Sequence, residues 1–315
     1  MNKNNALLFK RKKWGRRDVK DMVFVAILSV LPMLQFLIFY VYVNINSVVM
    51  AFQTYKSDPV SGSGGYVWYG MRNFVRAWKE FAHDKVLLIA LKNSAITFVT
   101  GIAVGTVLAL FFSYYIYKKR MFSSAFKVML FLPSILSAIV MVLLYKNFVN
   151  FAIPKLWEKL FHAPLEGLTS TSKTRFPTVL FYCIWSGFGT QILLYSGAMS
   201  SISDSLVEAA QLDGANLLQE FWHITLPQVF PTLSTFLIAS TAGFFTADLN
   251  LFSFYSTNAE AQTWTTGYYL LRAVKLAGTA EYPYLACLGL IYTAVTLLCV
   301  FGVKKLLQKV GPSTY

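Results

Sequence analysis

The stretch EAAQLDGANLLQEFWHITLP, residues 208–227, interrupts a chain made mostly of long apolar runs. Four small residues in this stretch recur at positions i, i+1, i+4 and i+5, which places them on one face of a helix. They are Ala209, Ala210, Asp213 and Gly214. A helix with such a face lets another surface approach its backbone closely. Gly214 is expected to weaken or end the helix, because glycine costs about 1 kcal/mol relative to alanine in a helix interior. Pro227 suits the first turn of a following helix, so the stretch predicts a short helix-turn-helix docked between two membrane spans.

The composition indicates an integral membrane protein. The chain has 315 residues, of which 56% are hydrophobic and 13% charged, and its mean hydropathy is +0.52. A soluble domain carries about 25% charged residues. The formal net charge is +14, but the basic residues lie beside apolar runs. We therefore interpret them as signals for membrane orientation and not as a nucleic-acid surface.

The chain lacks the motifs of an enzyme. It contains no G-x-x-x-x-G-K-[ST] loop that would hold ATP phosphates, no nucleophile elbow and no H-E-x-x-H. Its cysteines, Cys183, Cys287 and Cys299, all fall in apolar runs without C-x-x-C spacing, so no metal site or disulfide framework is expected. The sequence thus predicts a non-catalytic protein without a cofactor of its own.

Six apolar runs are long enough to cross a bilayer, and they define a permease domain over 22–308. We expect spans at 22–46, 87–117, 126–148, 177–198, 229–255 and 284–303. The first run is too long for a signal peptide, and the basic segment 1–21 before it places the N-terminus in the cytoplasm. An even number of spans puts the tail, 309–315, on the same side. The polar segments 53–84, 149–176 and 258–282 are expected as outer loops.

The central stretch resembles the EAA loop in the integral membrane subunits of bacterial ABC importers. The shared pattern is Glu208-Ala209-Ala210, then Asp213-Gly214-Ala215, then Ile224, Leu226 and Pro227. The resemblance implies an all-α fold, the type I importer permease fold of six transmembrane helices. In that fold the loop, here 200–227 between spans four and five, forms a cytoplasmic coupling helix docked in a groove of a separate ATPase subunit. The residues assigned to this coupling are Glu208, Ala209, Ala210, Asp213, Gly214, Leu226 and Pro227. Asp204 or Ser205 is expected as the N-cap of the helix.

The same resemblance implies the partners and the location. We expect a second, homologous permease that forms a heterodimer with this chain, two copies of an ATPase that hold ATP and Mg, and an extracytoplasmic solute-binding protein. The location is the bacterial plasma membrane, with both termini cytoplasmic. The loop 200–227 has no Lys or Arg but four acids, Asp204, Glu208, Asp213 and Glu220, which favours a partner with a basic groove.

Other stretches favour a carbohydrate substrate. Tyr69-Gly70-Met71-Arg72-Asn73-Phe74, the span-three segment LPSILSAIV around Pro133, and Trp185-Ser186-Gly187-Phe188-Gly189 resemble carbohydrate importers. Over residues 20–308 the chain is similar to the larger permease subunit of maltose-type importers. Sugar contacts carried over from that subunit fall on Ser134, Ala138, Trp185, Ser186, Gly187, Thr190, Gly243, Phe244 and Ala247. Only Trp185 and Gly187 keep the residue type, so the resemblance implies a substrate other than maltose.

Asp248 is the only acid well inside an apolar run. It lies 19 residues after Val229, about 28 Å along a helix at 1.5 Å per residue, so we expect it toward the outer side, facing a cavity or a partner. The aromatic and polar neighbours of spans four and five suit sugars, whose C–H faces stack on rings.

Several alternatives stay open from the sequence. A permease for peptides, amino acids or phosphate compounds would share the same loop, and a secondary transporter would need no ATPase. Basic outer residues, Lys155, Lys159, Lys173 and Arg175, suit an acidic oligosaccharide or an acidic binding protein equally well.

Overall fold

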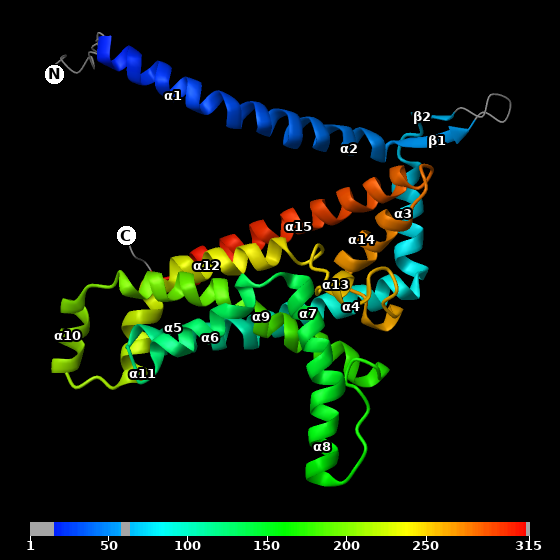
Figure 1. Cartoon of the computed structure of the whole chain (residues 1–315). Helices are drawn as coiled ribbons and strands as arrows, with labels where there is room; N and C mark the ends of the chain where they lie inside the picture. The colour runs from blue at the N-terminus through cyan, green and yellow to red at the C-terminus, as the bar shows by residue number, and fades with distance from the viewer. Residues whose placement is uncertain (1–15, 58–63, 313–315) are drawn as a thin grey trace.

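The computed structural model describes residues 16–57 and 64–312 as a bundle of long helices (Figure 1). Most of the basic segment 1–21 and part of the tail lie outside the described residues. Five helices there are long and apolar enough to cross a membrane: Lys20–Ala51, Lys85–Tyr117, Ala138–Phe161, Ser172–Ser200 and Tyr282–Val310. Their parts are α1 (Arg16–Gln35), η1 (Phe36–Tyr42), α2 (Val43–Ala51), α4 (Lys85–Thr100), η2 (Gly101–Thr106), α5 (Val107–Tyr117), α7 (Ala138–Asn147), η3 (Phe148–Ala152), α8 (Ile153–Phe161), α9 (Ser172–Ser200) and α15 (Tyr282–Val310).

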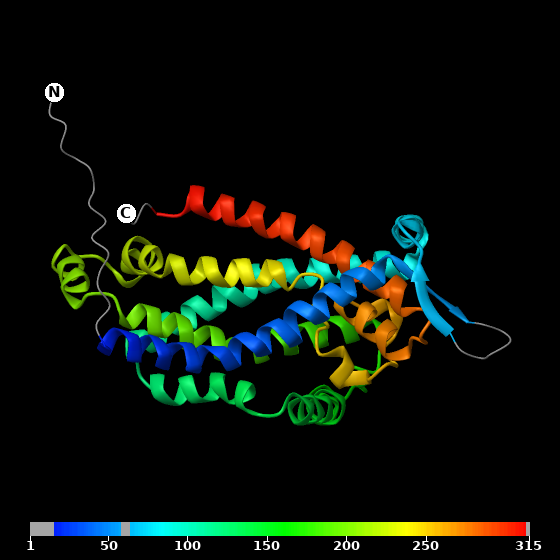
Figure 2. The same ribbon diagram turned by 90° about the horizontal axis from the view of Figure 1, so that it is seen from above.

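Helix α9 is the centre of the bundle. It packs against α5, against α6 (Ser123–Ile135) and against α12 (Leu226–Ala242). Phe188, Ile192 and Tyr195 of α9 are buried in the largest apolar cluster of the described residues. Figure 2 shows α15 beside α12, with which it is in contact. Burial of this apolar surface between helices holds the bundle together.

The first span lies apart from the others. Figures 1 and 2 show α1 and α2 crossing over the bundle, and α2 is the part of this span that packs against α15. None of its most apolar window is buried within the chain, and Phe24 and Leu31 are exposed. Its apolar surface is therefore left for lipid or for another subunit.

The predicted third span, 126–148, is wrong as one continuous helix. Helix α6 ends at Ile135, Leu136 is extended (ψ 152°), and α7 begins at Ala138. Pro133 weakens this end of α6, because proline lacks an N–H and clashes with the carbonyl four residues earlier. The predicted loop 149–176 is also partly helical, since η3 and α8 continue to Phe161. Figure 1 shows α8 pointing away from the bundle.

The predicted fifth span, 229–255, is interrupted as well. Helix α12 ends at Ala242 and a turn leads to α13 (Leu251–Tyr255). Leu249 and Asn250 both have positive φ (54° and 53°), which no continuous helix permits. Asp248 therefore lies in this turn, where its Oδ1 accepts from the Asn250 amide (3.2 Å), and not on a helix 28 Å from Val229.

The segment expected as a loop at 53–84 contains two strands and a helix among its described residues. Strands β1 (Gln53–Ser57) and β2 (Gly64–Trp68) form an antiparallel hairpin with Tyr55 opposite Tyr66. Helix α3 (Arg72–His83) follows. Asn73 Nδ2 donates to the carbonyls of Ala51 (2.9 Å) and Gln53 (2.8 Å). The asparagine of the Gly-x-x-Asn-Phe stretch thus fixes the chain where the first span meets the hairpin.

The predicted outer loop 258–282 also contains helical structure. It holds η5 (Ala261–Thr263) and α14 (Thr266–Leu276). Asn93 on α4 donates to the carbonyls of Gln262 (2.8 Å) and Trp264 (2.9 Å). At the start of α14, Gly267 lies so close to the α12–α13 turn that a Cβ there would come within 2.7 Å of the Ala247 carbonyl carbon.

We predict that Gly267→Ala lowers the thermal stability of the purified protein. The methyl group meets backbone of the turn, and such overpacking costs about 1–3 kcal/mol. Thermal unfolding in detergent measures the effect. Gly302→Ala on α15 is the matched control, because nothing lies within 4 Å of its Cβ position. Equal stability of the two variants would contradict this packing.

Candidate functional site: the coupling loop and a central cavity

The EAA stretch forms the short helix α10 (Asp204–Leu212). Gly214 follows its end with φ +79°, and the Ala215 amide donates to the Ala210 carbonyl (3.0 Å). The prediction that the helix ends at Gly214 is therefore confirmed, while its part in coupling stays a prediction. The N-cap is Ser203 and not Asp204 or Ser205; its hydroxyl lies 2.7 Å from that of Ser205.

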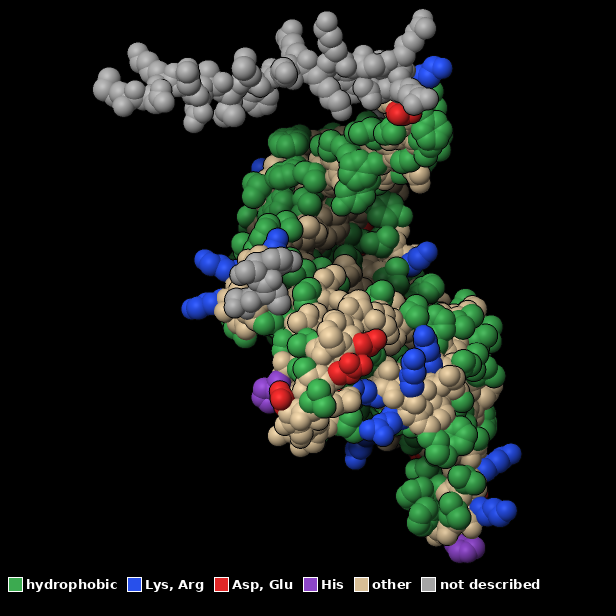
Figure 3. Space-filling view, turned by 90° about the vertical axis from the view of Figure 1, so that its left-hand side faces the viewer, with side chains coloured by type: hydrophobic (Ala, Val, Ile, Leu, Met, Phe, Trp, Pro, Cys, Tyr) green, Lys and Arg blue, Asp and Glu red, His purple; other side chains and the backbone are tan. Residues whose placement is uncertain are grey.

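The exposed side of α10 differs from the predicted small-residue face. Glu208, Ala209, Asp213 and Gly214 are exposed, but Ala210 is only 9% exposed and packs inward. Leu212 is 89% exposed. Figure 3 shows acidic side chains beside Lys and Arg on this end of the molecule. The loop therefore presents acids next to an uncovered leucine, a combination that fits a protein partner.

The helix after the loop begins earlier than predicted. Asn216 and Gln219 form a capping box (2.9 and 2.8 Å) at the start of α11 (Leu217–Glu220). The π-helical turn η4 (Phe221–Thr225) then continues without a break into α12. Pro227 lies in the first turn of α12, as predicted, but α12 continues η4 directly, so residues 217–242 form one helical run. The wider π turn before Pro227 accommodates a residue without an N–H.

A buried ion pair attaches this helix to α5. Lys118, the residue after α5, pairs with Glu220, which is 2% exposed. Beside it, the Tyr114 hydroxyl donates to the Leu217 carbonyl (3.0 Å), and the Lys118 ammonium lies over the Tyr117 ring (5.5 Å). Sequence reasoning counted Glu220 among the partner-facing acids, which is wrong. The two residues of this pair are 102 positions apart in the sequence. No local sequence pattern therefore predicts their contact.

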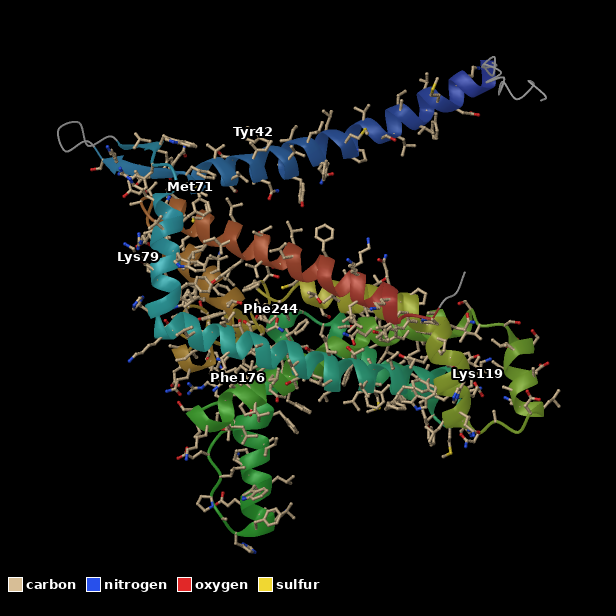
Figure 4. All side chains as sticks on the ribbon, turned by 180° about the vertical axis from the view of Figure 1, so that it is seen from behind. Tyr42, Met71, Lys79, Lys119, Phe176 and Phe244 are labelled. Carbon is tan, nitrogen blue, oxygen red and sulfur yellow. The ribbon has the colours of Figure 1, made fainter. Side chains whose placement is uncertain are left out.

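A cavity of about 250 Å³ lies between α4, α9 and α12. Three of the predicted sugar contacts, Gly243, Phe244 and Ala247, line it. The Phe244 ring meets Phe98 edge to face, with centroids 5.5 Å apart, and Figure 4 shows Phe244 in the middle of the molecule. The remaining lining residues are Ser94, Thr97, Phe98, Gly101, Ile102, Gln191, Ser240 and Thr265.

Gly187 lines a neighbouring cavity of about 160 Å³ that shares Thr97, Gly101 and Gln191 with the first. Sequence reasoning missed the lining residues of α4 as well as Gln191. Polar side chains inside the apolar runs of spans two and four were the signal that would have identified them.

The other predicted contacts do not line either cavity. Trp185 packs against Tyr145 and Tyr182 (centroids 6.4 and 6.3 Å) in an aromatic cluster. Ser186 bonds back to the Cys183 carbonyl (3.4 Å), and Ser134 bonds to the Phe131 carbonyl (2.7 Å). Of the remaining predicted residues, Ala138 and Thr190 are exposed on the surface, and Asp248 lies in the turn between α12 and α13.

A second ion pair joins the start of α9 to the loop that precedes α14. Arg175 pairs with Glu260, which also accepts from the Ser172 hydroxyl (2.8 Å). Hydrogen bonds from Arg175 and Ser172 lower the pKa of Glu260. They hold the loop that carries Thr265 against α9. Arg175 is thus already paired, which removes it from the basic residues available to an acidic saccharide. Within residues 16–57 and 64–312, no cluster of His, Cys, Asp or Glu is suited to hold a metal ion.

We predict that Glu220→Gln strongly lowers stability. Removing one partner leaves the Lys118 charge uncompensated, and breaking a buried pair costs about 3–5 kcal/mol. Thermal unfolding in detergent is the measurement, with exposed Glu208→Gln as the control. The exchange Lys118→Glu with Glu220→Lys should recover part of the loss. An unchanged midpoint for Glu220→Gln would show that the pair does not stabilise the loop.

Comparison with known proteins identifies the family. Residues 101–310 match the family "Binding-protein-dependent transport system inner membrane component". The chain is 25% identical to the polygalacturonan/rhamnogalacturonan transport system permease YteP of Bacillus subtilis, over 98% of this chain and 95% of that one. It is 30% identical to the maltose/maltodextrin permease MalF of Vibrio parahaemolyticus, over 57% of this chain but only 35% of MalF.

Solved structures share the fold. A bacterial ABC transporter that imports the acidic polysaccharide alginate has a chain with TM-score 0.74 and 20% identity, covering 94% of this chain and 99% of that chain. A structure of a bacterial alginate ABC transporter with an alginate pentasaccharide-bound periplasmic protein also gives 0.74, at 19% identity and 93% and 97% coverage. These matches confirm the resemblance and do not favour a secondary transporter. The chain therefore belongs to the family of inner membrane components of binding-protein-dependent transport systems, and it is an integral membrane permease subunit of an ABC importer.

Proposed function

We propose that this permease translocates a sugar or oligosaccharide delivered by an extracytoplasmic binding protein. It pairs with a second, homologous permease and with two copies of an ATPase that bind ATP and Mg. Helix α10 couples their hydrolysis to transport, and both termini lie in the cytoplasm. The observation that carries the proposal is the exposed α10, which offers Glu208 and Asp213 together with uncovered Leu212 at one end of the bundle.

The position of α10 supports its coupling role. Figure 1 shows α10, the start of α1 and the end of α15 at the same end, and the β1–β2 hairpin at the other. The basic residues Lys118, Lys119 and Arg120 follow α5 at the α10 end (Lys119 in Figure 4), and Lys304, Lys305 and Lys309 lie on the last turns of α15. Positive charge marks the cytoplasmic side of a membrane protein, which supports a cytoplasmic α10.

The cavity and the relatives support a carbohydrate. Phe98 and Phe244 form an aromatic wall, while Ser94, Thr97 and Thr265 supply hydroxyl groups. Sugars are recognised by such combinations of flat apolar faces and hydrogen-bonding groups. YteP and MalF are named for the transport of polygalacturonan/rhamnogalacturonan and of maltose/maltodextrin. The apolar surface left open on α1 and α2 supports a second permease beside this one.

We predict that Glu208→Lys leaves the subunit inserted in the membrane but uncouples transport from ATP hydrolysis. The exposed carboxylate of Glu208 is expected to meet a basic residue of the ATPase, and reversing its charge replaces attraction with repulsion. Uptake of the substrate and co-purification of the ATPase measure the effect. Glu158→Lys on exposed α8 is the control. Normal uptake in Glu208→Lys would contradict the role of α10.

Co-expression with the neighbouring genes tests the substrate class. We expect the ATPase activity of the purified complex in lipid to rise severalfold when one binding protein loaded with its saccharide is added. The panel includes saccharides, amino acids, peptides and phosphate compounds. Stimulation by a non-sugar solute would overturn the carbohydrate assignment, and absence of any ATPase in the purified complex would overturn the coupling assignment.

A further inference from the structure

A further cavity lies at the α10 end of the bundle, away from the central cavity. Its volume is about 470 Å³, and it lies between the end of α5, the start of α6 and the last turns of α9. Figure 4 shows Lys119 at this end, and Figure 3 shows Lys and Arg side chains gathered there. The lining residues are Ile116, Tyr117, Lys119, Ser123, Ser124, Lys127, Leu193, Ser196, Gly197 and Ser200.

Two lysines in this lining are not paired with an acid. Lys119 and Lys127 form no ion pair within the described part of the chain, and the lining contains no Asp or Glu. Two acids act electrostatically on the cavity wall, Glu220 and Asp204. Glu220 is already bound to Lys118, so Asp204 alone opposes the two lysines. The cavity therefore keeps a net positive charge, which favours an anionic ligand.

Polar groups around the lysines are suited to the oxygens of a phosphate. The hydroxyls of Ser123 and Ser124 have no hydrogen-bond partner in the described residues, so both are free to donate. In the first turn of α6, the amides of Ser124 and Ala125 also bond to no carbonyl there. The hydroxyls of Ser196 and Ser200, in contrast, donate to backbone carbonyls of α9 (3.1 and 2.8 Å). Two ammonium groups with free hydroxyls and amides beside them are the donors that bind a phosphate ester.

The surroundings favour a membrane lipid as the source of this phosphate. Ile116 and Leu193 give the cavity an apolar side. Val128 and Leu132, one and two turns after Ser124 on the same face of α6, are exposed, and Figure 2 shows α6 at the edge of the bundle. Basic pockets between transmembrane helices on the cytoplasmic side bind the headgroups of anionic lipids. The apolar surface beside the lysines provides the place for an acyl chain.

We propose that this cavity binds the phosphate of an anionic membrane lipid such as phosphatidylglycerol. Lys119 and Lys127 hold the phosphate oxygens by charge-assisted hydrogen bonds, and the acyl chain lies along α6. The lipid thereby joins the start of α6 to the end of α9 at Ser200, just before α10 begins at Asp204. The choice of the inner leaflet rests on the proposed cytoplasmic position of α10. A soluble phosphate ester shares the headgroup chemistry, and the test separates the two sources.

Native mass spectrometry of the purified full chain, with its co-purifying subunits, measures the affinity. The probes are phosphatidylglycerol, zwitterionic phosphatidylcholine, and glucose 6-phosphate as a soluble phosphate ester. We expect phosphatidylglycerol to bind, and the double variant Lys119→Gln/Lys127→Gln to weaken it about thirtyfold, because both charges that hold the phosphate are removed. Lys304→Gln/Lys305→Gln removes two charges from exposed positions near the end of α15 and is the matched control, which should bind as the wild type does.

A second variant tests the cavity without removing a charge. Gly197 is in the lining, and nothing lies within 4 Å of its Cβ position. Gly197→Phe therefore places a ring in the space of the ligand without meeting the backbone. Gly302→Phe on α15 is the control, because its Cβ position is equally open. We expect phosphatidylglycerol to raise the thermal unfolding midpoint of the wild type and of Gly302→Phe but not of Gly197→Phe, since a ligand stabilises only a protein that binds it.

Three outcomes would contradict the proposal. Equal affinity for phosphatidylglycerol in the wild type and in both test variants, or equal affinity for phosphatidylcholine, would overturn the site. Tighter binding of glucose 6-phosphate, lost in the same variants, would show a soluble ligand and overturn the lipid. Lipid binding only after the ATPase is removed would show that a subunit covers the cavity. None of these readouts requires uptake, so their failure leaves carbohydrate transport and coupling by α10 unaffected.

Discussion

The turn between α12 and α13 is the constraint on which the rest of the site depends. Backbone that leaves a helix inside an apolar bundle is tolerated only where protein covers it or where it borders a cavity. Both conditions hold here. Thr265 donates to the Ala247 carbonyl, Gly267 lets α14 approach the turn, and Phe244 and Ala247 line the cavity. The turn that begins at Gly243 and polar side chains of α4, α9 and α12 line the cavity together.

Two ion pairs fix loops at opposite ends of the molecule: Lys118–Glu220 is buried, whereas the Glu260 carboxylate of Arg175–Glu260 is exposed. Arg175 at the start of α9 holds Glu260 and the loop over the cavity. At the opposite end Lys118 holds Glu220 and therefore the helix that follows α10. In both pairs the acidic and basic side chains bind each other, so their charges are not available to a partner protein.

Most polar groups within the bundle are satisfied by backbone. Asn93 donates to two carbonyls of the outer loop, and Asn73 does the same at the end of the first span. Gln191 departs from this pattern because its Oε1 is buried without a hydrogen-bond partner in the described residues, as are the side-chain oxygens of Tyr195, Thr225, Ser234 and Tyr292.

The sequence by itself determined the class of protein, the approximate positions of most spans, and the helix ended by Gly214, because hydrophobic length and glycine conformation are local properties. It also identified Gly243, Phe244 and Ala247 as cavity residues through a resemblance. Only the tertiary structure decided that spans three and five are interrupted, because Pro133 and Gly243 permit a helix to continue or to stop according to what packs around them. It likewise decided that Glu220 is buried with Lys118 and that Gln191 faces two cavities. Such pairings join distant segments, and their energies depend on burial, which a pattern of neighbouring residues does not contain.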